Sequence, residues 1–96
     1  MHGLIGRIRA QPGQRDALVS ILLESASSMP GCLSYIVALD PRDDDGIWVT
    51  EVWQDEASHK ASLQMPEVID AISRGKPLIA EFDQYHETVP VGGHGL

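Results

Sequence analysis

The segment Ile47–Leu63, IWVTEVWQDEASHKASL, limits the fold more than any other part of this 96-residue chain. Residues 47–53 alternate as a β-strand does, and both faces of that strand are largely apolar. Glu51 and Trp53 share one face, and Trp48 lies on the other. Because apolar strand faces are unfavourable in water, we expect both to be covered.

Strands and helices are predicted in a regular order along the chain. They are strands at His2–Ala10, Cys32–Asp40, Ile47–Gln54 and Glu81–Val89, a helix at Arg15–Met29, and helical segments after Asp55 and at Glu67–Arg74. This β-α-β-β-α-β order is typical of an α+β, ferredoxin-like fold, in which a four-stranded antiparallel sheet carries its helices on one face. The other face then needs a partner, most simply a second copy of the chain.

Apolar or small residues mark one face of the first helix and one face of the second strand. The helix face consists of Leu18, Ile21, Leu22, Ser25, Ala26 and Met29, and the strand face of Leu33, Tyr35, Val37 and Leu39. The sequence DPRDDDG at Asp40–Gly46 favours a solvated hairpin loop and lacks the ligand spacing of a calcium loop. Asp55 is a good helix N-cap, and Pro66 interrupts the helix that follows it.

The size and charge of the chain narrow the classes of function. Ninety-six residues make one domain, predicted at residues 1–90 with a flexible tail at 91–96. Fourteen acidic side chains outnumber seven basic ones, and no Lys/Arg cluster occurs, which disfavours binding to nucleic acid or to anionic membranes. The single cysteine, Cys32, excludes an intramolecular disulfide and a cysteine-based zinc site. We expect a cytoplasmic protein, because we find neither a signal peptide nor an apolar run that could span a bilayer.

The element order, the length and the motif E-x-W-x-D-E-A at Glu51–Ala57 resemble the antibiotic biosynthesis monooxygenase family over nearly the whole chain. The resemblance implies a homodimeric α+β barrel, in which two sheets pack face to face with the helices outside. It also implies a pocket between the sheet and the helices. Some members oxidise quinols or polyketide anthrones there with O2 and without flavin, metal or haem, and a related branch degrades haem.

Carried over residue by residue, the resemblance points to three positions in this pocket. The tryptophan of the polyketide-oxidising members falls on Trp53, their phenol on His59 and their strand asparagine on Val49. Of these three positions, only the tryptophan has the same residue type here, and the sequence contains no asparagine. The polar groups of the haem-degrading branch are missing at the equivalent positions, so haem degradation is not expected.

The residues themselves suit proton transfer from an aromatic substrate. His59 can accept or donate a proton near neutral pH, and Trp53 offers a flat apolar wall and an N–H donor. Glu51 can orient His59 or a substrate hydroxyl. We predict these three as catalytic residues, without a metal site or a bound cofactor. The predicted substrate-binding residues are Val49, Leu63 and Gly6.

Each of these assignments has a structural alternative. Trp53 can be a simple core residue, and His59 can be an exposed helix residue. Glu51 can instead pair with Arg7 or Arg9 on a neighbouring strand.

Four further residues depend on which sheet face they occupy. Trp48 is expected at a dimer interface, because it lies on the strand face opposite Trp53. For Tyr35, Tyr85 and His86 the pattern does not determine the face, so their roles stay open.

The sequence therefore favours a cofactor-independent monooxygenase that acts on a quinol or a polycyclic aromatic and O2. The alternative is a non-catalytic dimer on the same scaffold, with a small-ligand-binding or stress-response role. The missing asparagine favours this alternative. An isomerase is a third option, because His59 and Glu51 would serve proton transfer equally well.

Overall fold

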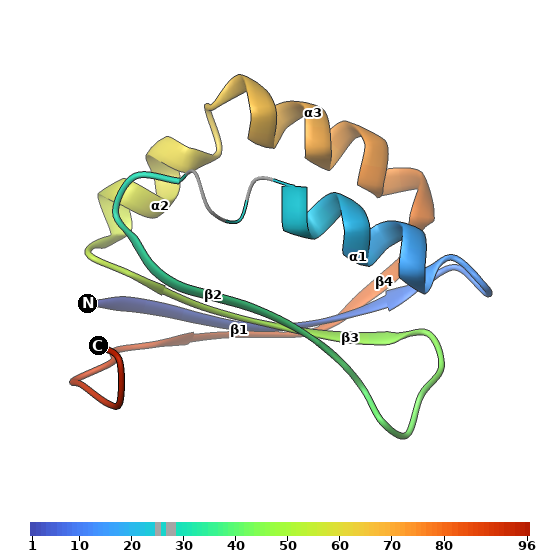
Figure 1. Ribbon diagram of the computed structural model, residues 1–96, viewed down its shortest axis with the longest axis horizontal. Helices are drawn as coiled ribbons and strands as arrows, with labels where there is room; N and C mark the ends of the chain where they lie inside the picture. The colour runs from blue at the N-terminus through green and yellow to red at the C-terminus, as the bar shows by residue number, and fades with distance from the viewer. Residues whose placement is uncertain (25, 27–28) are drawn as a thin grey trace.

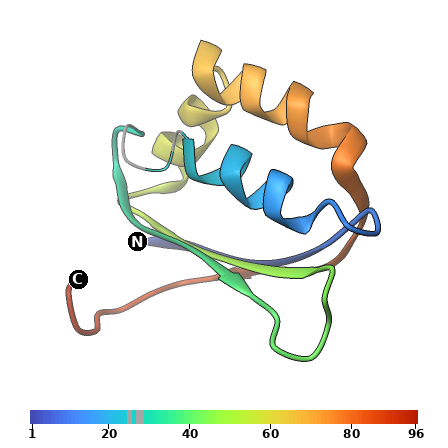
Figure 2. The ribbon, with the colours of Figure 1, turned by 45° about the vertical axis from the view of Figure 1, so that its right-hand side comes forward.

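The computed structural model describes residues 1–24, 26 and 29–96. The strands are β1 (His2–Ala10), β2 (Cys32–Leu39), β3 (Gly46–Trp53) and β4 (Ile79–Thr88), and the helices are α1 (Arg15–Glu24), α2 (Glu56–Ser62) and α3 (Pro66–Gly75), with a 3-10 turn at Lys76–Leu78. The strands form one antiparallel sheet in the order β2-β3-β1-β4. The three helices lie on one face of this sheet (Figures 1 and 2). The predicted ferredoxin-like α+β fold is therefore confirmed.

Several predicted element boundaries differ from the observed ones, most of them by one residue. The first helix ends at Glu24 and not at Met29. Residues 25, 27 and 28 lie outside the described part of the chain. The prediction that Ser25 belongs to the helix face therefore concerns a residue outside it. The last strand begins at Ile79, two residues early, because the 3-10 turn leads directly back to the sheet.

The helical segment after β3 begins where the sequence predicts, but it ends at Ser62 and not at Met65, immediately before Pro66. Asp55 caps α2, since its Oδ1 accepts a hydrogen bond from the backbone N–H of Ser58 at 2.7 Å. Pro66 occupies the first turn of α3, where its missing N–H costs nothing. The short α2 ends at Ser62, beside the sheet.

The core lies between the helices and the two central strands, β1 and β3. Its most buried apolar side chains are Leu4, Ile8, Ala10, Leu18, Ile47, Val49, Trp53 and Val68, whereas Val52 is buried on the opposite face of β3. Leu18 packs from α1 onto Ile8 and Ile47. The predicted alternation of β1 is confirmed, because Leu4, Gly6 and Ile8 share the helix-facing side.

The predicted face of β2 is wrong at one residue. The pairing with β3 shifts between Cys32 and Ser34, so Leu33 lies in a bulge outside the alternation. Leu33 is 48% exposed, and Leu39 at the other end of the strand is 50% exposed, whereas Tyr35 and Val37 pack against the core.

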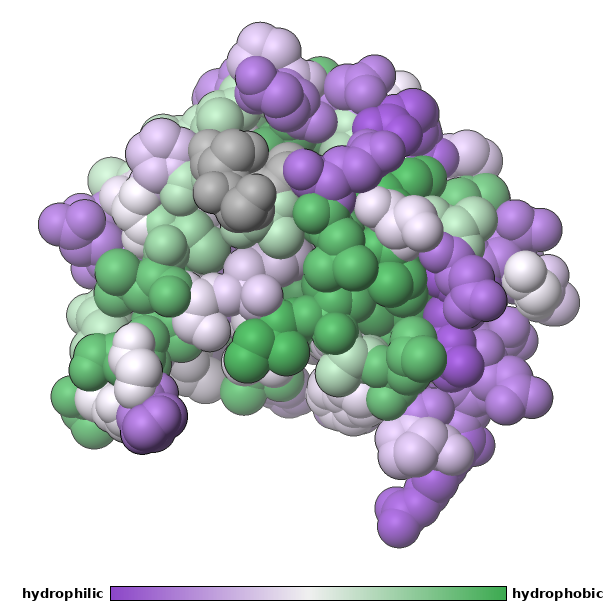
Figure 3. Space-filling view, in the orientation of Figure 1, coloured by the Kyte–Doolittle hydropathy of each residue, from purple (hydrophilic) through white to green (hydrophobic). Residues whose placement is uncertain are grey.

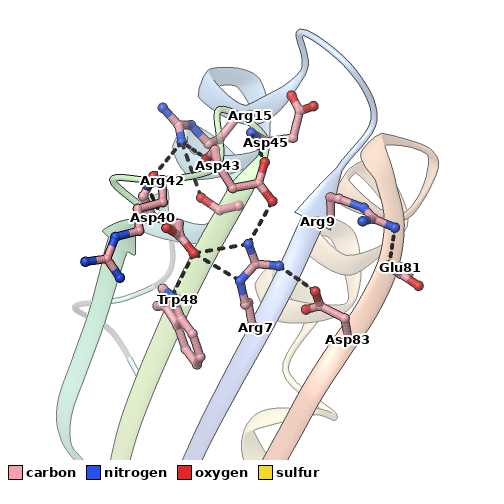
Figure 4. A network of polar contacts seen from close by, with 11 residues as sticks. Arg7, Arg9, Arg15, Asp40, Arg42, Asp43, Asp45, Trp48, Glu81 and Asp83 are labelled. Atoms are coloured by element: carbon pink, nitrogen blue, oxygen red, sulfur yellow. Dashed lines mark hydrogen bonds and ion pairs between the residues drawn. The ribbon is translucent and has the colours of Figure 1, made fainter.

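On the opposite sheet face, Arg7 forms the centre of an ion-pair network at the β2–β3 hairpin (Figure 4). Its guanidinium pairs with Asp40 at 3.1 Å, with Asp43 at 2.7 Å, and with Asp83 of β4. Gly46 makes room for this arrangement, because a Cβ there would lie 2.6 Å from Arg7 Nη2. Arg7 is almost fully buried among these carboxylates.

The sequence suggested a solvated hairpin loop, but in the structure this loop also contacts the rest of the protein. Besides the contacts of Arg7, Arg15 of α1 donates to the backbone carbonyl of Asp43 at 2.7 Å. Asp40 also accepts a hydrogen bond from Trp48 Nε1 at 3.2 Å. These contacts fix the acidic loop to both the sheet and α1.

Apolar and hydrophilic side chains separate clearly on the surface. Figure 3 shows apolar side chains gathered where α1 lies over the sheet, and hydrophilic ones along the hairpin at the lower right. In the described part of the chain, no helix combines the length and apolar character needed to cross a membrane.

The Arg7 network predicts a pH-dependent loss of stability in Arg7→Met. Hydrogen bonds from Arg7 and from the Asp45 N–H hold the pKa of Asp43 below its usual range, and the Arg42 N–H and Arg7 do the same for Asp40. A carboxylate with a lowered pKa stabilises the fold above its unfolded pKa, and this contribution is lost as the pH falls through the folded pKa.

We expect Arg7→Met to unfold at a clearly lower urea concentration than the wild type at pH 7, with the gap narrowing below pH 3. Arg9→Met is the matched control, because Arg9 forms a half-exposed pair with Glu81 on the same strand face. Equal urea midpoints for the two variants at pH 7 would contradict the prediction.

Candidate functional site

A cavity of about 470 Å³ lies between the helix-facing side of the sheet and the three helices. All of the residues predicted as catalytic or substrate-binding line it, namely Gly6, Val49, Glu51, Trp53, His59 and Leu63. Most of the lining is apolar. The few polar side chains are therefore the groups that could orient or react with a ligand.

Trp53 closes one end of the cavity and holds Glu51 in place. Its side chain is 1% exposed, and its Nε1–H donates to Glu51 Oε1 at 3.0 Å. The sequence suggested that this N–H could donate to a ligand, but in the structure it already donates to Glu51. Glu51 also does not pair with Arg7 or Arg9, since both arginines lie on the other sheet face with aspartate and glutamate partners.

The carboxyl group of Glu51 has an altered acidity. Burial raises the pKa of Glu51, and the hydrogen bond from Trp53 and the charges of His59 and His2 oppose that rise. A cavity carboxyl with a raised pKa can accept or release a proton closer to neutral pH than a surface carboxyl can. Glu51 therefore has the acidity expected of a proton-transfer group.

His59 projects from α2 onto the same end of the cavity. Its ring centroid lies 5.2 Å from that of Trp53 and 5.7 Å from that of His2. The backbone carbonyl of His59 accepts a hydrogen bond from Ser62 Oγ at 2.6 Å, within the same helix. The capped, short α2 thus places an imidazole beside the Glu51–Trp53 pair.

Two tyrosines whose faces the sequence left open also line the cavity. In the strand register, Tyr35 of β2 lies opposite Glu51 of the neighbouring strand β3, and Tyr85 of β4 lies opposite Gly6 of β1. Burial, with a smaller contribution from the charge of Glu51, raises the pKa of Tyr35 to about 12. The Tyr35 hydroxyl is thus a donor and not a base at neutral pH. By contrast, His86 pairs with Ile5 on the other face.

Sequence reasoning missed these phenols because it depends on strict alternation. In β4 the pairing with β1 shifts between Arg7 and Ile8, which brings Phe82 and Tyr85 to the same face although they are three residues apart. Asp83 lies in the irregular stretch and turns to Arg7 instead. A signal existed for Tyr35, which shares its predicted face with Val37, a core neighbour.

The middle of the cavity floor is formed by Gly6. It lies between Val49 of β3 and Tyr85 of β4 in the same cross-strand row. A Cβ added at Gly6 would have its nearest neighbour at 3.8 Å, the backbone oxygen of Gln84. The missing side chain therefore leaves open space above the sheet and does not relieve a clash.

The described residues contain no cluster of three or more His, Cys, Asp or Glu side chains placed to hold a metal ion. Cys32, at the start of β2, is partly buried, and burial raises the pKa of its thiol. It therefore lacks the lowered pKa of a nucleophilic cysteine.

Comparison with protein families gives a match over most of the chain. The model of the antibiotic biosynthesis monooxygenase family matches residues 1–74. A crystal structure from Chloroflexus aurantiacus J-10-fl that bears the same family name is 69% identical. The match covers 97% of this chain and 95% of the other, with a TM-score of 0.95.

More distant structures share the fold. One from Deinococcus radiodurans has 23% identity and a TM-score of 0.81, over 97% of this chain and 95% of that one. One from Pseudomonas aeruginosa has 24% identity and a TM-score of 0.80, over 95% and 94%. A curated relative, an uncharacterised protein of Synechocystis, is 25% identical over 79% of this chain and 54% of its own length, so the chain spans about half of that relative.

The raised pKa of Glu51 predicts a pH-dependent gain of stability in Glu51→Gln. Folding lifts the pKa above its ordinary value of 4.5, so the folded state keeps the proton to higher pH than the unfolded state does. The free energy of unfolding of the wild type therefore falls as the pH rises through the folded pKa.

Glutamine carries no such cost and still accepts the Trp53 N–H. We expect urea unfolding to show Glu51→Gln as more stable than the wild type at pH 8 and as equally stable near pH 4. Glu67→Gln, at an exposed site on α3, serves as the control. A Glu51→Gln variant that loses stability at pH 8 would overturn the prediction.

Proposed function

Because the chain belongs to the antibiotic biosynthesis monooxygenase family, we propose that it oxidises a quinol or a similar electron-rich aromatic with O2, without a bound cofactor. The observation that carries the proposal is the end of an apolar cavity at which Glu51, held by Trp53, lies with His59. An apolar cavity suits an aromatic ring, and its few polar groups suit removal of a single hydroxyl proton.

The proposed reaction balances without an added reductant. His59 takes the proton of a substrate hydroxyl, and the resulting anion passes one electron to O2. The substrate radical and superoxide combine in a C–O bond, the peroxide takes up a proton, and its O–O bond breaks. One oxygen atom stays on the substrate and the other leaves as water, so a quinol becomes a hydroxyquinone and supplies all four electrons.

The cavity residues take separate roles in this reaction. His59 is the base, and Glu51, at the same end of the cavity, orients the imidazole or the substrate hydroxyl. Trp53 positions Glu51 through its N–H and offers an aromatic wall. Tyr35, whose raised pKa keeps its hydroxyl protonated, donates to the substrate oxyanion, a role that the N–H of Trp53 cannot fill.

An oxygen electrode with hydroquinone, menadiol and dithranol as substrates tests this proposal. We expect O2 uptake above the uncatalysed rate with at least one of them. We expect kcat to fall about a hundredfold in His59→Ala, as is typical for loss of a general base. Trp53→Phe should also lower kcat, since Glu51 loses its donor, whereas His94→Ala in the C-terminal tail should not.

Absence of uptake with every substrate, or full activity in His59→Ala, would contradict the proposal. A ligand that raises the melting temperature without any turnover would favour the ligand-binding alternative instead.

We also propose that the protein is a homodimer that buries the sheet face opposite the helices. This face carries Ile5, Ile36 and Trp48, and Ile36 is more than half exposed. An uncovered sheet with apolar side chains on both faces is unfavourable in water, and a two-fold pairing of sheets would cover it.

Analytical ultracentrifugation of Ile36→Glu tests the dimer. We expect the wild type to sediment as a dimer and Ile36→Glu to shift toward the monomer, because a carboxylate would be buried in the interface. Ile69→Glu, an equally exposed isoleucine on α3, is the matched control and should stay dimeric. A monomeric wild type would exclude the interface.

A further inference from the structure

The cavity is open on one side, and its two sides differ in polarity. The α1 helix packs against β1, β2 and β3 and against α3, which leaves the helix-facing side of β4 as the least covered part of the sheet. Four large apolar or aromatic side chains line the cavity and are nevertheless exposed, and we call them the cavity rim. They are Leu63, Ile72, Phe82 and Tyr85.

The rim is exposed to an unusual degree for such side chains. Phe82 is 65% exposed and Tyr85 is 61% exposed, although both belong to a strand. Single exposed apolar residues are common, but a group of them that continues directly into a cavity marks a binding surface. The rim therefore extends the cavity outward as an apolar surface.

The opposite side of the cavity is deep and holds the polar groups. Tyr35 and Glu51 lie there on β2 and β3, with Trp53 almost fully buried behind them. A ligand that satisfies these groups must bring its hydroxyl to this end. Its remaining atoms then point toward β4.

The path between the two sides runs diagonally over Gly6. Leu4 lies directly opposite Glu51 on β1, and Gly6 is the next residue of β1 on this face. Neighbouring strands lie about 4.8 Å apart, so β3 and β4, which flank β1, are separated by about 10 Å. Gly6 lies on β1 in the middle of this distance, and its missing side chain leaves the floor free. No side chain rises from β1 at this point to block an elongated ligand.

The volume of the cavity also favours an elongated ligand. A volume of about 470 Å³ lies in the range that holds drug-sized ligands. At about 30 Å³ for each water-sized atom, one dihydroxylated ring would fill roughly half of it. The space over Gly6 and the rim is therefore left for a further part of the substrate.

We propose that the substrate is a phenol or quinol with an apolar extension, bound with its hydroxyl at Glu51 and Tyr35 and its extension over Gly6 to the cavity rim. The inference rests on the proposed function for the identity of the reacting group. It adds that Gly6 and Ile72 select the substrate by its apolar part.

Binding of phenol and 4-hexylphenol, measured by calorimetry, tests the inference without any turnover. We expect the wild type to bind one 4-hexylphenol per chain, at least about tenfold more tightly than phenol, because each buried CH2 contributes about 0.8 kcal/mol. In Ile72→Ser the ratio of the two dissociation constants should shrink at least threefold. Ile69→Ser is the matched control, since Ile69 is 50% exposed on the same helix but does not line the cavity.

Gly6→Val gives an independent test, because it places a side chain in the path without a predicted backbone clash. We expect the ratio of dissociation constants to fall toward one in this variant. A wild type that binds both phenols equally, or a hexyl preference that survives in Gly6→Val, would overturn the inference. So would a preference that Ile72→Ser and Ile69→Ser weaken equally.

The outcomes also separate this inference from the proposed function. A hexyl preference lost in Gly6→Val and Ile72→Ser supports the inference even if no quinol is oxidised. If Ile72→Ser keeps the hexyl preference and changes the sedimentation of the protein, the rim belongs to an interface between copies, and the inference fails.

Discussion

The alternation of side chains along β1 and β3 is the constraint on which the rest of the structure depends. These strands pair in the centre of the sheet, with Gly6 opposite Val49 and Arg7 opposite Trp48. A slip of one residue would exchange the two faces of a strand. It would carry the Arg7 guanidinium into the apolar cavity and turn Leu4 and Ile8 away from the helices. The fold therefore allows one register only.

This register sorts the charged groups into two environments with opposite acidity. On the helix side, Glu51 is partly buried with few donors, and its pKa is raised. On the other side, Asp43 meets a guanidinium, and its pKa is lowered. Burial without a cation favours the protonated carboxyl, and a neighbouring cation favours the carboxylate. Carboxylates of one sheet thus lie in two settings, one in the cavity, where we propose that Glu51 takes part in proton transfer, and one at the hairpin, which Asp43 attaches to Arg7.

Sequence reasoning succeeded where local periodicity decides the structure and failed where a bulge or a long-range partner does. The limits of β1 and the shared face of Glu51 and Trp53 followed from alternation, and Asp55 followed from capping chemistry. The bulge at Leu33 and the joint placement of Phe82 and Tyr85 depend on pairing between distant strands, which a single sequence does not reveal. The use of the Trp53 N–H by Glu51 likewise required the side-chain geometry.

The position of the cavity rim has a consequence for how such a scaffold diverges. Phe82 and Ile72 are largely exposed, and substitutions at exposed sites usually change the free energy of unfolding little. Trp53 and Val49 lie in the core, where substitutions are costly. Mutation can therefore explore new ligand shapes at the rim while the end that we propose for proton transfer is held constant. A lineage of this fold is thus free to change what it accepts before it changes how it reacts.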